Sequence, residues 1–305
     1  MLRVTFLGTG GSVPTPKRNP SAILVNRKGE LMLFDCGEGT QQQMMRAKTG
    51  MGNLTSIFIT HFHADHILGI PGLIQTMNFN GRTEPLKIYG PHWVNEFVRM
   101  MLAIGFYKLK YEIQAIELHP GDRVDRGEYY IDAIRTEHSV PSIGYALAEA
   151  DRPGRFDRDK ALELGIPPGP LFKRLHNGED VEFQGRIIKS SDVVGSPRPG
   201  RRIVYSGDTR PCSGVFVASD KADILIHDST LADDMVDWAN ESMHSTAGEA
   251  ASLASLANVH QLVLTHISSR YSEDTSQLLE DALDEFNNVC IAEEFMVIEI
   301  PYRDD

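Results

Sequence analysis

Four potential metal ligands lie within six positions, just after an apolar run. Residues 61–66 read His-Phe-His-Ala-Asp-His and directly follow the β-branched stretch 56–60, which predicts a buried strand. On extended backbone, residues two apart point to the same side, so His61 and His63 can bind one cation, while the following turn brings Asp65 and His66 toward a second. Imidazoles with one carboxylate and no nearby thiolate favour zinc, then manganese, iron or cobalt, over calcium or magnesium. A polar loop whose histidines only cap a strand would leave this density of ligands unexplained.

Three further residues with metal-binding side chains follow later in the chain, each near the end of an expected strand. They are His138 in Thr-Glu-His-Ser-Val, Asp208 in Ser-Gly-Asp-Thr-Arg and His266 in Leu-Thr-His-Ile. A single histidine at a strand end is more often a structural residue than a ligand. In series after His-x-His-x-Asp-His, these residues complete a set too large for one metal ion. Two neighbouring cations suit the hydrolysis of phosphate esters, because they activate water and stabilise charge on the phosphoryl oxygens.

The elements that must position these residues follow from hydrophobic patterning. Strand-like runs alternate with helical patterns, which indicates a layered α/β domain. Several expected strands end in a residue able to do chemistry, among them Asp35, His227 and His266, and loops at strand ends commonly converge on one cleft. The expected strands are 4–8, 22–26, 31–35, 56–60, 86–89, 129–135, 203–206, 224–226, 262–265 and 295–300, and the expected helices 39–48, 67–78, 93–104, 246–257 and 273–286.

Length and composition are those of an ordinary globular protein. The chain has 305 residues, of which 41% are hydrophobic, enough for one sizeable core or two small ones. It shows neither an apolar stretch long enough to span a bilayer nor the parts of a signal peptide, so we expect a cytoplasmic protein without a membrane partner. Three widely spaced cysteines, Cys36, Cys212 and Cys290, argue against a disulfide framework and fit a reducing compartment.

Residues 151–202 interrupt the alternation of strands and helices. This segment contains the run Gly-Ile-Pro-Pro-Gly-Pro at 165–170, which disfavours regular helix or central strand. It carries eleven Lys and Arg against eight Asp and Glu, a balance of +3, in a chain whose net charge is −12. The overall charge argues against nucleic acid as a partner, but a relatively basic insertion could bind a polyanion. A solvated mobile loop is the alternative interpretation of the same segment.

Taken together, the seven residues resemble the metallo-β-lactamase superfamily over nearly the whole chain. The resemblance implies an α/β fold, the αββα sandwich with a two-zinc site at the edge between its halves, formed by one domain of residues 1–305 with an inserted arm at 151–202. It also implies that three histidines hold the first metal ion and that one aspartate and two histidines hold the second. A further aspartate would bridge the two ions. By position these are His61, His63 and His138 for the first, Asp65, His66 and His266 for the second, and Asp208 for the bridge.

Within that superfamily, the chain is similar to the ribonuclease Z family. The likeness is carried by residues 14–19, 34–41, 206–211 and 243–246 and by the Gly-Pro-rich insertion after His138. It implies a zinc-dependent endoribonuclease that removes the 3′ trailer from precursor tRNA and leaves a 3′-hydroxyl on the tRNA, with Mn²⁺ or Fe²⁺ as alternative ions. It further implies a homodimer and a flexible arm that grips the tRNA.

The same resemblance assigns roles to individual residues. His244 would be the general acid toward the leaving ribose oxygen, a task that suits an imidazole with an ordinary pKa of about 6.5. Asp65 would serve both as a ligand and as the proton acceptor for the attacking water. Gly169 and Pro170 match the arm motif of the family. Independently of the resemblance, the position of Asp35 at the end of an expected strand fits either a residue that orients the ligand loops or an ordinary turn carboxylate.

Two segments depart from the family pattern. The motif His-Glu-Ala-Thr is replaced by His-Asp-Ser-Thr at 227–230, so Asp228 stands where a longer carboxylate would orient His244. In the loop expected to read the tRNA 3′ end, Pro16 takes the place of a lysine, whereas Arg18 and Asn19 match. Discrimination against mature CCA ends is therefore less well supported by the sequence than cleavage itself.

Other functions remain compatible with parts of this pattern. A hydrolase of small phosphodiesters or related esters, without an RNA substrate, would share the metal ligands but give the insertion no function. A redox diiron protein of the superfamily usually carries Glu in place of His63. A silent RNA-binding protein would have lost ligands, yet all seven are present.

Overall fold

The computed structural model describes residues 1–105 and 107–303. Their contacts form two compact units, which are described separately. The first, the body, comprises Met1–Asp125, Ile131–Leu147 and Arg202–Pro301. The second, the arm, comprises Arg126–Tyr130 and Ala148–Arg201, with Tyr302 and Arg303. No helix in the described residues is both long and apolar enough to cross a membrane.

One seven-stranded sheet is built mainly by the first 117 residues, in the order β16-β1-β2-β3-β4-β5-β6. Strands β3 to β6 are parallel, and helices α1 to α4 lie in the connections between them. The elements are β1 (Leu2–Gly8), β2 (Ala22–Arg27), β3 (Glu30–Phe34), α1 (Thr40–Arg46), β4 (Leu54–Phe58), α2 (Ala64–Ile67), α3 (Gly69–Phe79), β5 (Leu86–Gly90), α4 (Val94–Leu102), β6 (Ile113–Glu117) and β16 (Val297–Glu299).

A second seven-stranded sheet has the order β15-β14-β13-β12-β9-β8-β7. Its strands β12 to β15 are again parallel. The elements are β7 (Arg123–Asp125), β8 (Tyr129–Arg135), β9 (Ile143–Glu149), β12 (Arg202–Tyr205), α8 (Ser213–Ala218), β13 (Ile224–Asp228), η1 (Asp233–Met235), α9 (Val236–Ser242), α10 (Ala247–Leu256), β14 (Gln261–Thr265), η2 (Ser269–Tyr271), α11 (Ser276–Leu283) and β15 (Val289–Ile291).

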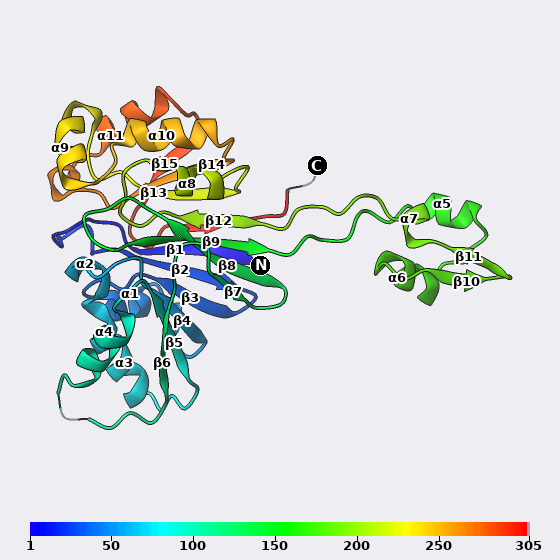
Figure 1. The fold of residues 1–305 in the computed structure, drawn as a ribbon, viewed down its shortest axis with the longest axis horizontal. Helices are drawn as coiled ribbons and strands as arrows, with labels where there is room; N and C mark the ends of the chain where they lie inside the picture. Colours follow the sequence, from blue (N-terminus) through cyan, green and yellow to red (C-terminus); the bar gives the residue numbers. More distant parts are fainter. Residues whose placement is uncertain (106, 304–305) are drawn as a thin grey trace. The chain divides into compact units, whose positions relative to one another are not determined.

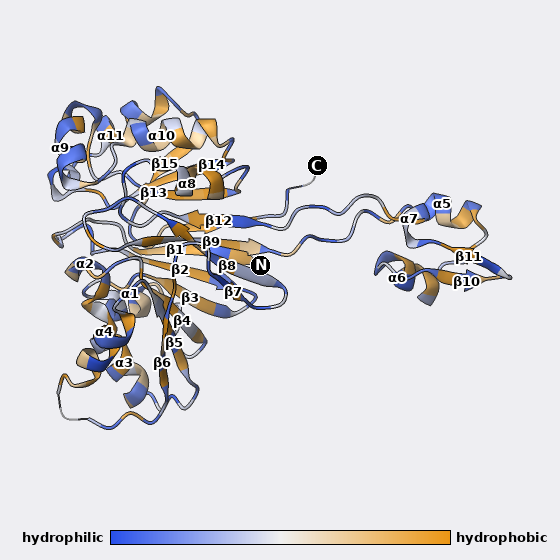
Figure 2. Cartoon of the chain, viewed as in Figure 1, coloured by the Kyte–Doolittle hydropathy of each residue, from blue (hydrophilic) through white to orange (hydrophobic). Residues whose placement is uncertain are grey.

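The two sheets pack face to face, with helices on both outer sides (Figure 1). Aromatic rings fill the space between the sheets. The ring centroids of Phe58 in β4 and Tyr145 in β9 are 5.2 Å apart, and those of Phe34 in β3 and Tyr205 in β12 are 6.4 Å apart. Separate apolar clusters lie under α1, α3 and α4 and under α8, α10 and α11. Figure 2 shows that apolar residues are concentrated in the strands of both sheets. The predicted αββα sandwich is therefore confirmed.

The arm has a small core of its own. It contains α5 (Arg158–Glu163), α6 (Pro170–His176), the hairpin β10 (Val181–Phe183) and β11 (Arg186–Ile188), and α7 (Ser190–Val193). Ile166, Leu175 and Val181 are buried among these elements. Helix α6 begins at Pro170, where a proline costs nothing because the first turn of a helix has no partner for its N–H groups.

Several element boundaries differ from those expected. Strand β4 ends at Phe58, two residues before the predicted end, so His61 lies in a loop instead of directly after the strand. The expected helix 67–78 is divided into α2 and α3 at Leu68. Strand β9 was not predicted, because its sequence Ile-Gly-Tyr-Ala-Leu-Ala-Glu contains four residues of low strand propensity and is buried on both faces.

Candidate metal centre

The loops that follow the carboxyl ends of strands from both sheets meet at one edge of the sandwich. Such ends are the usual place for a site in parallel sheets, because the helical crossovers leave them open. Asp35 follows β3, residues 59–66 follow β4, Asp208 follows β12 and His266 follows β14. His138 lies between β8 and β9, and His244 between α9 and α10. All seven predicted ligands are thus brought into one neighbourhood.

The first ligand group consists of His61, His63, His138 and Asp208. One potential ligand atom from each of these side chains lies within 4.8 Å of the others. His63 Nδ1 and His138 Nε2 are 3.3 Å apart, and His61 Nε2 is 3.6 Å from Asp208 Oδ2. Three imidazoles and a carboxylate at this spacing form a donor set typical of zinc.

The second ligand group consists of Asp65, His66 and His266, whose ligand atoms also lie within 4.8 Å of one another. His266 Nε2 is 3.3 Å from Asp65 Oδ2 and 3.2 Å from Asp208 Oδ2. His66 Nε2 is 3.3 Å from the same Asp208 oxygen. Asp208 therefore contacts members of both groups, as a bridging carboxylate would.

Unsatisfied polar atoms show that these residues fit metal ions. Among the described residues, seven buried side-chain atoms have no hydrogen-bond partner, and three of them belong to proposed ligands: His61 Nε2, His66 Nε2 and Asp208 Oδ1. Buried polar atoms are nearly always paired, because desolvation without a partner is costly. Three such atoms, all belonging to proposed ligands, would be satisfied together by cations bound between the side chains.

The protonation states also suit metal binding. Burial lowers the pKa of His61, His63 and His138, so their imidazoles are neutral at pH 7, as ligation requires. Burial by itself would raise the pKa of Asp208, but the neighbouring His266 and His66 outweigh it and hold the pKa well below the usual value. Conversely, Asp208 and Asp35 raise the pKa of His66 despite its burial, so a proton balances the carboxylates when no metal is bound.

Asp35 holds Thr60 and His66, which lie in the segment after β4 of the first sheet. Its carboxylate accepts hydrogen bonds from the Thr60 amide at 2.8 Å, the Thr60 hydroxyl at 2.9 Å and the Tyr205 hydroxyl at 2.8 Å. His66 Nδ1 lies 2.8 Å from the same carboxylate. Asp35 is completely buried and has φ 56°, in the left-handed region that aspartate adopts more readily than most residues other than glycine.

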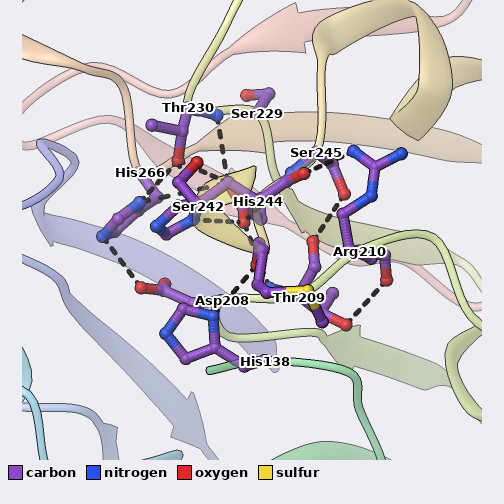
Figure 3. Close-up of polar contacts among 12 residues, drawn as sticks. His138, Asp208, Thr209, Arg210, Ser229, Thr230, Ser242, His244, Ser245 and His266 are labelled. Carbon is purple, nitrogen blue, oxygen red and sulfur yellow. Dashed lines mark hydrogen bonds and ion pairs between the residues drawn. The ribbon is translucent and has the colours of Figure 1, made fainter. Parts of the chain in front are cut away.

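His244 pairs with Asp228, and its ring lies next to those of His138 and His266, which Figure 3 labels together with it. His244 Nδ1 is 2.8 Å from Asp228 Oδ2, so the shorter carboxylate reaches the imidazole directly. Burial alone would lower the pKa of His244, but the charge and hydrogen bond of Asp228 outweigh it and raise this pKa to about 9. Arg210 donates to the His244 carbonyl and pairs with Glu249, which fixes the segment that carries His244.

The four residues proposed to bind substrate differ in their exposure to solvent. Arg18 is buried, and its guanidinium donates to Thr9 Oγ1 at 2.7 Å and to the Ala292 carbonyl at 2.6 Å. Asn19 is half-buried, and its side chain contacts the Glu38 carbonyl. Gly169 and Pro170 are exposed at the start of α6, with open space beside Gly169.

The structure also shows the contacts of four polar residues near the centre that are not proposed as ligands. His227 is buried inside β13 and its Nδ1 contacts the Asp228 carbonyl, outside both ligand groups. Thr246 caps α10, accepting from the Glu249 amide while the Glu249 side chain accepts from the Thr246 amide. The sequence interpretation missed Thr60 and Thr230, two hydroxyl residues that contact ring nitrogens of the centre. Their only signal was their position, since one precedes His61 and the other closes the segment 227–230.

Comparisons with known proteins agree with this architecture. The family model described as "Anti-Pycsar protein Apyc1" matches residues 2–152, and the "Beta-lactamase superfamily domain" model matches residues 183–267. The ribonuclease Z of Methanosarcina acetivorans is 63% identical over 303 residues, covering 99% of each chain. That of Methanosarcina mazei is 62% identical over 305 residues and covers 100% of both. Among solved structures, the short form of human tRNase Z matches with a TM-score of 0.71 and 30% identity, over 98% of this chain and 99% of that one.

Full-length identity of this degree goes well beyond a shared fold. The motifs that suggested the family from sequence alone lie where the structure assembles the ligand groups. The chain therefore belongs to the ribonuclease Z family.

Proposed function

We propose that this protein is a zinc-dependent endoribonuclease that cleaves the 3′ trailer from precursor tRNA and leaves a 3′-hydroxyl on the tRNA. The observation that carries the proposal is the arrangement of two ligand groups around Asp208, with the His244–Asp228 pair beside them. Membership in the ribonuclease Z family supports tRNA processing as the activity. A metallo-hydrolase of small phosphodiesters would share the ligand groups and is the alternative.

In this proposal two zinc ions are held by the two ligand groups, with Asp208 as the shared ligand. Mn²⁺ or Fe²⁺ would be accepted by the same donors, because all three ions bind imidazole and carboxylate. When bound, such a pair of ions lowers the pKa of water and stabilises the charge that develops on the phosphoryl oxygens.

Two side chains of the protein would carry out the proton transfers of the reaction. Asp65 remains ionised, since His266 and His66 outweigh the effect of burial and lower its pKa. Its carboxylate is held by the Ser12 amide at 2.7 Å and can accept a proton from the attacking water. As the water oxygen bonds to phosphorus and the bond from phosphorus to the ribose O3′ breaks, His244 would donate a proton to O3′. Asp228 holds His244 Nδ1 and leaves Nε2 for this donation.

The arm would supply much of the affinity for tRNA. Residues 151–202, which make up most of the arm, carry a charge balance of +3, which is complementary to a polyanionic ligand. Gly169 and Pro170 present exposed backbone at the start of α6, where RNA could approach closely. At the active site, we propose that the 14–19 loop contacts the tRNA 3′ end, with Asn19 facing the RNA and buried Arg18 holding the loop in place.

We also propose that the enzyme is a cytoplasmic homodimer, as its family membership suggests. In such a dimer the arm of one subunit could serve the active site of its partner. Sedimentation would give the mass in solution. Mixing an armless variant with a His63→Ala variant should restore cleavage if arm and active site cooperate between subunits, and should not if each subunit works alone.

A precursor tRNA carrying a 3′ trailer tests the proposed reaction. Zinc-loaded protein should release a tRNA ending in a 3′-hydroxyl at the discriminator base and a trailer with a 5′-phosphate. A matched substrate with a mature CCA end measures discrimination. Turnover of a small diester without cleavage of the precursor would replace this proposal by the alternative hydrolase.

A further inference from the structure

Two buried carboxylates, one from each half of the sandwich, use the same arrangement of hydrogen bonds. Asp35 contacts His66 Nδ1 directly at 2.8 Å and also accepts the Thr60 hydroxyl at 2.9 Å. That hydroxyl lies 3.0 Å from His61 Nδ1. Asp35 therefore reaches one imidazole directly and a second through a threonine.

Asp228 repeats the arrangement in the second sheet, where Figure 3 shows the Thr230 side chain beside His266. It contacts His244 Nδ1 directly at 2.8 Å and accepts the Thr230 hydroxyl at 2.6 Å. The Thr230 hydroxyl lies 2.8 Å from His266 Nδ1 and, at a longer 3.2 Å, from His244 Nδ1.

The direction of these bonds decides which ring nitrogen carries the hydrogen. A threonine hydroxyl has one hydrogen, and an ionised carboxylate can only accept. Thr60 and Thr230 therefore give their hydrogens to Asp35 and Asp228, and their lone pairs accept N–H from His61 Nδ1 and His266 Nδ1. Each histidine is then left with its lone pair on Nε2, the atom that faces Asp208 at 3.6 Å in His61 and 3.2 Å in His266.

We propose that Thr60 and Thr230 are matched positioning residues, each selecting the metal-binding tautomer of one histidine: Thr60 for His61 in the first ligand group and Thr230 for His266 in the second. The inference rests on the proposed function, in that it takes both groups to bind metal. Partners of this kind, one shell beyond the ligands, typically change metal affinity by about 10- to 100-fold when removed. Each threonine would thus affect the binding affinity for one of the two ions.

Valine is the informative replacement, because it keeps the shape of threonine and removes only the hydroxyl. The backbone contacts that hold each loop do not depend on that hydroxyl: the Thr60 amide donates to Asp35 at 2.8 Å and the Thr230 amide to Asp228 at 3.0 Å. Serine keeps the hydroxyl and loses a methyl group, so Thr60→Ser and Thr230→Ser are the matched controls.

The test is a zinc titration of metal-free protein against a chromophoric chelator, for the parent and the four variants. Thr60→Val should weaken one of two binding events about 10- to 100-fold, Thr230→Val should weaken the other, and both serine variants should stay near the parent. In a His63→Ala background, which impairs the first group, Thr230→Val should weaken the remaining ion and Thr60→Val should not. Two unchanged affinities in the valine variants would overturn the inference.

Nitrogen-15 spectra of the zinc-loaded parent give a reading that does not depend on how well the variants fold. The ring signals of His61 and His266 should show hydrogen on Nδ1 and the metal on Nε2, and the reverse assignment would overturn the inference. A parent that binds two zinc ions with this pattern but leaves precursor tRNA uncut would refute the proposed substrate and leave the role of the threonines standing.

Discussion

The pairing of Asp228 with His244 can be tested by replacing Asp228 with Asn, which preserves size and removes the charge. The carboxylate accepts from the Thr230 amide and hydroxyl on Oδ1 and from the Thr209 amide and His244 on Oδ2. An asparagine would keep its oxygen toward the two Thr230 donors and turn its NH₂ toward His244. The imidazole would lose its negative partner and accept, instead of donate, at Nδ1.

The size of the effect follows from the direction of the pKa shift. In the parent, Asp228 overcomes the effect of burial and raises the pKa of His244 to about 9. Without that charge, burial should bring the pKa to about 6.5 or below, so the protonated fraction at pH 8 falls from about 90% to about 3%, roughly thirtyfold. Because the folded pKa lies above the unfolded one, the pair stabilises the protein below pH 6.5 by on the order of 3 kcal/mol, and this contribution is lost as pH rises through 9.

Two measurements check these values. Proton spectra of the metal-free parent and variant should place the His244 titration near pH 9 and at or below pH 6.5, with Asp220→Asn as an exposed control for the change in net charge. In the zinc-loaded enzymes at pH 8, cleavage of precursor tRNA should fall by at least the roughly thirtyfold loss of protonated His244, and by up to about 10⁴-fold if the reoriented imidazole no longer acts as a general acid. Turnover of a nitrophenyl diester should change far less, because nitrophenolate leaves without a proton.

An unshifted His244 titration in Asp228→Asn would show that the carboxylate does not control the imidazole. Equal losses on both substrates would mean that the pair supports the metal centre instead of protonating the leaving group. Zinc content must stay at the parent level for either reading, and it is measured on the same samples.

Three further outcomes are expected. His63→Ala and Asp208→Ala should abolish cleavage, since the first removes a ligand and the second the shared one; near-parent rates in metal-saturated assays would refute their roles. Deleting most of residues 151–202 should weaken precursor tRNA binding, measured by filter retention, far more than small-diester turnover, and equal losses would indicate a structural role. Arg201→Met removes the guanidinium that pairs with the buried Glu149 at 2.7 Å and should lower the free energy of unfolding by about 3–5 kcal/mol in urea titrations, whereas a loss below about 1 kcal/mol would contradict the importance of this buried pair.

Much of this centre could be predicted from the sequence because its ligands are dense and follow strands. His-x-His-x-Asp-His marks a site by composition alone, and strand ends place Asp208 and His266 nearby once β12, β13 and β14 are known to be parallel. The alternation of apolar strands and helices predicted a layered α/β domain, and the resemblance to the metallo-β-lactamase superfamily specified the αββα order of its layers. The sequence also identified Asp228 as a departure from the family, and the structure shows that its carboxylate still reaches His244.

Other features depended on contacts between distant segments. Thr60 and Thr230 look like ordinary β-branched or polar residues until Asp35 and Asp228 are placed beside them. Arg18 resembles a solvent-facing cation in sequence, yet the Ala292 carbonyl, 274 positions away, accepts its hydrogen bond in the interior. In the arm, short helices around a few apolar residues lack the long periodicity that pattern reading requires.

The number of metal ions in active protein tests the central claim most directly. Elemental analysis of well-folded chain, purified without added metal and then reconstituted with zinc, should find two ions per subunit, and cleavage of precursor tRNA should rise with the occupancy of both. Full activity with one ion or fewer per subunit would contradict the two-metal centre built around Asp208.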